Sequence, residues 1–144
     1  MNVPFVIEAL LVARRACRDG AVERARQCRA EMQAAESVRT TIEQRLQRTL
    51  ALRADCVTRM ARLARDGADA AAERSHAGEH VAMLGARADD IRIDLSRAEH
   101  TLAIARAQLE EALAFLTRAQ KRLDAALERR AEWEHEARNA ERRA

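Results

Sequence analysis

Residues 95–126 read LSRAEHTLAIARAQLEEALAFLTRAQKRLDAA, and within this stretch a leucine recurs at every seventh position. An alanine follows each of these leucines three positions later. Apolar residues that alternate by three and four mark the a and d positions of a coiled coil, where they face another helix. The alternation extends from Val81 to Ala140, with Arg130 as its only polar member. We therefore predict a long helix that buries one narrow hydrophobic seam.

A weaker seam with the same spacing runs through the first half of the chain. Its members are Ala25, Cys28, Met32, Ala35, Arg39, Ile42, Leu46, Thr49, Arg53, Cys56, Met60 and Leu63. Arg39, Thr49 and Arg53 interrupt it, but an arginine lays its aliphatic stem on apolar surface while its charged head stays in water. The first half is therefore predicted to form a second long helix.

The segment between the two seams, residues 65–80, has the composition of a turn. It contains Gly67 and Gly78 and no large aliphatic side chain. Glycine lowers the stability of a helix interior and is common where a chain reverses. We predict one helix over about residues 4–66, a turn over about 67–80 and a second helix over about 81–142.

Two registers and one different architecture are compatible with this pattern. A reversal near residue 72 places residue i opposite residue 144 − i, so that Met60 meets Leu84 and Leu11 meets Trp133. A slide of seven residues also matches seam to seam. The three-four spacing continues through the glycines, so one uninterrupted helix in a parallel dimer is the alternative. A hairpin arm would be ~93 Å long and an uninterrupted helix ~215 Å.

The composition supports burial along a seam and not in a globular core. Hydrophobic residues make up 48% of the chain and charged residues 34%, whereas aromatic residues make up only 2%. A globular core of this size normally contains several aromatic side chains. The predicted fold is accordingly all-α, a long two-helix antiparallel coiled-coil hairpin that forms one domain over residues 1–144.

The charge and the cysteines indicate a cytoplasmic protein. The net charge is +3, and residues 1–66 carry 13 arginines against eight acidic residues. Such a basic helix is a solvated face or steers a partner with an acidic surface. The three cysteines form no CxxC motif, which is typical of small buried side chains in a reducing compartment. The apolar residues 3–12 are too few to span a bilayer and lack a basic leader.

No pattern in the sequence indicates an enzyme, a cofactor or a small-molecule substrate. His76 and His80 have the spacing of helical metal ligands, but no third ligand is evident, so we expect no metal site. The acidic pairs 89–90 and 110–111 lie in no predicted cleft that would shift their pKa. We do not expect nucleic acid as a partner, because no aromatic platform accompanies the arginines.

The two ends of the sequence are the best candidates for binding another protein. Apolar residues near the N-terminus surround more than one face of the first helix, and a hairpin buries only one face. Trp133 and nearby arginines would lie beside them. The candidate partner-binding residues are Phe5, Ile7, Leu10, Leu11, Arg14, Arg15, Arg129, Arg130 and Trp133. The alternatives are a simple end cap, in which Trp133 covers Leu11, and docking on a membrane surface.

The chain resembles a known family over its whole length, and two segments carry the resemblance. The opening LLVARRACRDGAVERARQCRAEMQAAE (10–36) and the charged, tryptophan-containing ending ERRAEWEHEARNAERRA (128–144) are similar to the stalk subunits of bacterial type III secretion and flagellar export machines, the YscO/FliJ type. The length and the predominance of two helices agree with this resemblance.

The resemblance implies a mechanism and a location. Members of that family form an antiparallel hairpin at the centre of a hexameric export ATPase and link it to the export-gate protein of the membrane, and some bind export chaperones. The paired termini are expected to face the ATPase ring. Contact with the membrane would be indirect, in a protein that is cytoplasmic and peripheral at the inner-membrane secretion apparatus. The alternatives are a structural coiled-coil tether or dimeric scaffold without a motor and, less favoured, a nucleic-acid-associated coiled coil.

Overall fold

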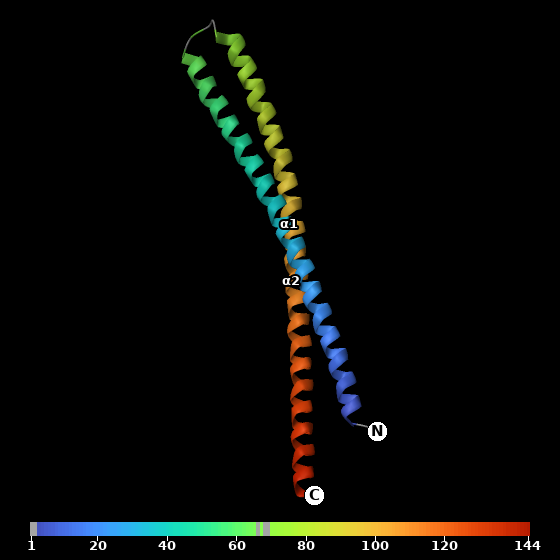
Figure 1. Cartoon of the computed structure of the whole chain (residues 1–144). Coiled ribbons are helices and arrows are strands. Elements are labelled where there is room, and N and C mark those ends of the chain that lie inside the picture. Colours follow the sequence, from blue (N-terminus) through green and yellow to red (C-terminus); the bar gives the residue numbers. More distant parts are fainter. Residues whose placement is uncertain (1–2, 66, 68–69) are drawn as a thin grey trace. The chain divides into compact units, whose positions relative to one another are not determined.

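The computed structural model describes residues 3–65, 67 and 70–144, and it is helical almost throughout (Figure 1). Helix α1 comprises Val3–Arg65 and helix α2 comprises Ala71–Arg143. The two helices pack against each other in antiparallel directions, and the described residues contain no strand. The prediction of an all-α antiparallel hairpin is therefore confirmed, and the alternative of one uninterrupted helix is wrong.

The packing divides the hairpin into two units. The terminal unit comprises Met1–Met32 and Ala105–Ala144, and the turn unit comprises Gln33–Ile104. Each unit is a pair of antiparallel helical segments with its own buried clusters. Leu11, Leu123 and Ala126 form one cluster of the terminal unit, and Leu46, Ala88 and Ile91 form the cluster of the turn unit.

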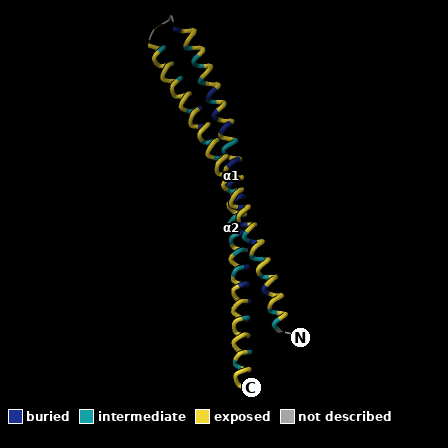
Figure 2. The backbone as a smooth tube through the Cα atoms, in the orientation of Figure 1, coloured by how far each residue is buried: buried dark blue, intermediate teal, exposed yellow. Residues whose placement is uncertain are grey.

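The buried side chains follow the predicted seam along both helices (Figure 2). Every seam position of α2 from Val81 to Ala137 is buried or half-buried, and only Ala140 is exposed. In α1 the same spacing extends beyond the predicted start, through Ala21 and Leu11 to Pro4. The Leu and Ala rows differ, because Leu109 and Leu116 remain half-exposed whereas Ala112 and Ala119 are buried.

The register differs from the predicted one by seven residues. Leu11 packs with Leu123 and Ala126, not with Trp133, and Leu46 packs with Ala88 and Ile91. The numbers of two opposed residues thus add up to about 137 and not to 144. This is the alternative register, in which one helix is shifted by seven residues. The seam accepts either register. The difference follows from where the chain reverses, because α1 ends at Arg65 and α2 begins as early as Ala71, and this earlier reversal selects the lower sum.

The turn is shorter than predicted because residues 71–80 belong to α2. Gly67 has a φ of 90°, and its carbonyl oxygen accepts a hydrogen bond from the Ala70 amide at 3.4 Å. This left-handed conformation suits glycine and stops α1. Alanines at the start of α2 are strong helix formers. Gly78 lies within α2 facing α1, where a Cβ atom would meet Met60 Cε at an ordinary 3.6 Å.

Arginines at seam positions reach across to the flank of the opposite helix. Among the described residues, three such contacts cross between the helices: Arg18 Nη1 donates to Gln120 Oε1 at 3.4 Å, Arg39 Nε lies 3.7 Å from Glu99 Oε1, and Arg130 Nε lies 3.2 Å from Glu8 Oε1. The two residue numbers of each pair add up to 138, one more than the sum for residues that face each other in the seam. The arginine partner therefore lies beside the seam position of the opposite helix, and the guanidinium points out of the seam to reach it. This geometry explains how the seam tolerates charged members.

Candidate protein-binding surface

The N-terminal part of α1 exposes large apolar side chains that α2 does not cover. Phe5 is 74% exposed, Val12 64%, Val6 47% and Leu10 38%. In the three-four frame that contains Leu11, these four residues lie outside the seam on both of its sides. We call Phe5, Val6, Leu10 and Val12 the N-terminal apolar surface. A cluster of this kind on a helical pair is typical of a protein interface.

Two of the predicted partner-binding residues support this surface from beneath. Leu11 has no exposed area and forms a core cluster with Leu123 and Ala126, and Ile7 is half-buried against that cluster. A partner cannot reach Leu11 while α1 and α2 stay packed. The structure therefore changes the interpretation of Leu11 from a binding residue to a core residue, because the α1 seam begins earlier in the chain than we predicted.

Trp133 does not cover Leu11 as the end-cap interpretation requires. It lies seven residues beyond Ala126 along α2, is half-buried, and falls opposite Pro4 in the observed register. After Trp133, α2 continues to Arg143, and Figure 1 shows this end of α2 extending past the beginning of α1. The predicted cluster is therefore spread along the terminal unit and not gathered at one point.

Of the four predicted arginines, Arg14 and Arg130 are half-buried and Arg15 and Arg129 are exposed. Arg130 is held inside the unit, with its Nε 3.2 Å from Glu8 Oε1 and 3.0 Å from Glu134 Oε1. Arg14 is half-buried at a seam position, whereas Arg15 and Arg129 are exposed. Arg130 therefore ties the N-terminal part of α1 to α2. Arg15 and Arg129, on opposite sides of the seam, are the guanidinium groups best placed to meet a partner.

A further set of residues was missed because it lies beside the seam and not in it. Val22 and Leu113 are half-buried and line a recess between the helices together with Leu116. On the opposite side of α2, the Arg118 guanidinium lies 5.9 Å from the centre of the Phe115 ring. The only sequence signal is a second apolar row, in which Leu113 and Leu127 occupy equivalent heptad positions.

The two histidines that have the spacing of metal ligands lie in the turn unit. His76 and His80 share a small recess with Cys56 and Glu73 near the turn. Among residues 3–65, 67 and 70–144, however, no three His, Cys, Asp or Glu side chains form a set that could hold a metal ion. Across those same residues, neither helix offers a stretch long and apolar enough to cross a bilayer.

Comparisons of the chain with protein-family models, with curated proteins and with solved structures find no match.

Proposed function

We propose that the chain is a stalk-like coiled-coil component of a bacterial type III protein secretion apparatus, which binds the hexameric export ATPase and links it to the export-gate protein. The observation that carries this proposal is the N-terminal apolar surface, because Phe5 and Val12 are each more than half exposed on a helix whose opposite face is already packed. Exposed aromatic and aliphatic side chains beside arginines have the composition of a binding site.

The contacts beneath this surface support a rigid presentation to a partner. Leu11 anchors α1 on α2, and the Glu8–Arg130 ion pair joins the two helices close to Phe5. A surface that is ordered before binding loses less conformational entropy when it docks. In this proposal the N-terminal apolar surface, with Arg15 and Arg129, meets the ATPase ring, and the turn unit is left for the export gate. Export chaperones are further candidate partners.

A structural tether or scaffold without a motor is the second candidate. It is favoured by apolar side chains exposed on the turn unit, where Leu52 is 55% and Ile93 is 53% exposed. Such side chains would promote lateral association of copies. Single exposed apolar residues are nevertheless common on proteins, which is why we favour the stalk.

Affinity capture from the native host tests the proposal. The wild-type chain, the Phe5→Asp variant and the Leu52→Asp variant would each be used as bait, with retained proteins identified by mass spectrometry. Leu52 is a matched control because it is also a large exposed apolar residue of α1. We expect the wild type and Leu52→Asp to retain an export ATPase and Phe5→Asp to lose it. Capture of only the chain itself would instead support the scaffold.

A further inference from the structure

One side of the terminal unit carries a groove between α1 and α2. Two adjoining recesses, with volumes of 470 Å³ and 230 Å³, share Val22 and Leu116 in their walls. The α1 side is lined by Arg18, Val22, Ala25, Arg26 and Arg29, and the α2 side by Leu113, Leu116, Thr117, Gln120 and Lys121. The groove does not include any residue of the N-terminal apolar surface, so it is a separate site.

The floor of the groove is apolar because the core beneath it is made of small residues. Ala25, Cys28 and Ala112 form the buried cluster, and Leu113 and Leu116 pack on it while remaining half-exposed. Small core side chains bring two helices close together and leave the larger neighbours only partly covered. Val22 completes the floor from α1.

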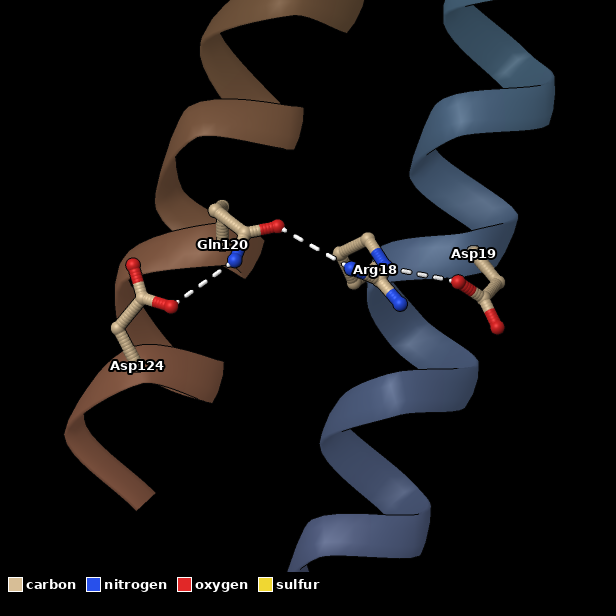
Figure 3. A network of polar contacts seen from close by, with 4 residues as sticks. All are labelled: Arg18, Asp19, Gln120 and Asp124. Carbon is tan, nitrogen blue, oxygen red and sulfur yellow. Dashed lines mark hydrogen bonds and ion pairs between the residues drawn. The ribbon is translucent and has the colours of Figure 1, made fainter. Parts of the chain in front are cut away.

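The rim of the groove is positively charged. The residues that line the two recesses include four basic side chains, Arg18, Arg26, Arg29 and Lys121, and no acidic one. Arg18 contacts Asp19 and Gln120, as Figure 3 shows, and Arg26 lies 3.2 Å from Glu23. Within the part of the chain that the structure describes, Arg29 and Lys121 form no ion pair.

We propose that this groove docks an acidic amphipathic helix of a partner protein. The groove between two packed helices is where a third helix places its ridge of side chains. The occupant would present apolar residues at i, i+3, i+4 and i+7 to Val22, Leu113 and Leu116, with Asp or Glu on either side of that stripe. These carboxylates would face Arg29 and Lys121.

A second copy of the chain is a poorer occupant than an acidic helix. In an isologous dimer the same patch meets itself, so the four cations of one groove would face the four cations of the other. Electrostatic complementarity therefore points to an acidic partner.

A synthetic peptide provides the probe. We would use a fluorescein-labelled amphipathic peptide of about four helical turns, with leucine on the inward stripe and glutamate on both flanks. A second peptide would carry lysine in place of every glutamate. Fluorescence anisotropy with the full chain should show saturable binding of the glutamate peptide only. Carbon-13 methyl spectra should show shifts at Leu113 and Leu116.

Paired charge reversals then locate the site. The double variant Arg29→Glu, Lys121→Glu should weaken binding of the glutamate peptide by about tenfold or more, since two rim contacts become repulsive. The double variant Arg62→Glu, Arg97→Glu is the matched control, because it changes the net charge equally at exposed positions outside the groove. It should bind like the wild type, and circular dichroism should show both variants equally helical.

Four results would overturn the proposal: no binding of the glutamate peptide, equal binding of the lysine peptide, equal weakening by the two double variants, or methyl shifts confined to other leucines. A concentration-dependent dimer that Arg29→Glu, Lys121→Glu abolishes in sedimentation would identify a second copy as the occupant and would also reject an acidic helix. None of these variants alters the N-terminal apolar surface, so failure here leaves the stalk proposal standing.

Discussion

In the terminal unit, Leu11 is completely buried, whereas Phe5, six residues before it, is 74% exposed and Val12, the next residue, is 64% exposed. In the turn unit, Ile91 is 2% exposed and Ile93 is 53% exposed, but the exposed apolar residues of that unit are scattered along the helices. Both units thus use the same heptad seam as their core. The units differ in the spacing of their exposed apolar side chains, which are close together in the terminal unit and far apart in the turn unit. Exposed apolar side chains that lie close together are the better indicator of a binding site.

The cross-helix polar contacts differ between the two units as well. In the part of the terminal unit that the structure describes there are two, Arg18 to Gln120 and Arg130 to Glu8. The turn unit has Arg39 to Glu99, whereas the equivalent position opposite Arg53 is Gly85, which has no side chain to pair with. The terminal unit is therefore more completely joined across the seam. Four sets of substitutions test the differences between the two units, in order of decreasing effect.

Leu11→Asp should have the largest effect, because it places a carboxylate in a site with no exposed area. We expect it to lower the free energy of unfolding by about 3 kcal/mol or more. Phe5→Asp, at a site that is 74% exposed, should change it by less than about 0.5 kcal/mol. Urea unfolding followed by circular dichroism measures both. Equal losses would show that Phe5 is also structural.

Ile91→Ala should destabilise the turn unit by about 2–4 kcal/mol, since it leaves a cavity beside Leu46 and Ala88. Ile93→Ala, two residues away on the exposed face, should cost less than about 0.5 kcal/mol. The same urea titration compares the two variants. A large loss for Ile93→Ala would mean that the outer face of the turn unit is covered, for instance by another copy.

Gly85→Glu should stabilise the turn unit by about 1 kcal/mol, mainly because glycine is a poor helix former. A Cβ atom at this position would meet Arg53 Nε at 3.5 Å, so the new carboxylate would lie near that guanidinium. Gly85→Ala is the control that isolates helix propensity. A higher melting temperature for both, and slightly higher for glutamate at low salt, is expected. Destabilisation by alanine would contradict the packing described.

Glu8→Gln should have the smallest effect, because Glu8 and Arg130 are partly exposed to solvent, which screens their ion pair. We expect a loss of about 0.5 kcal/mol or less. A double-mutant cycle with Arg130→Gln measures the coupling. The corresponding cycle for Arg39 and Glu99 gives the value for the turn unit. A coupling well above 1 kcal/mol in the terminal unit would show that the pair is more shielded than its exposure indicates.

The seam was predictable from the sequence because heptad spacing reports directly which face of a helix is buried. The register was not, since a slide of seven residues leaves every seam match intact, and the missing information lay in the turn. The glycines and alanines of residues 67–80 were interpreted as a turn, although alanine is a strong helix former and α2 begins at Ala71. The groove at Val22 and Leu113 was missed because these residues lie outside the a and d positions.

The exposed residues of the candidate site were predictable for a similar reason. Phe5 and Leu10 exceed what one seam can bury, so their exposure followed from the spacing alone. The burial of Leu11 and the separation of Trp133 from it depended on the register. Heptad spacing therefore shows which face of a helix is buried. It shows which residues of the two helices face each other only when the position of the turn is known.

The most direct test of the proposed function is the rate of ATP hydrolysis by the export ATPase of the same host, measured with and without the purified chain. We predict that the wild type raises the rate, and that Phe5→Asp, Val12→Asp abolishes the increase while circular dichroism shows an unchanged helix content. No increase with the wild type, or the same increase with the double variant, would contradict a stalk that acts through the N-terminal apolar surface.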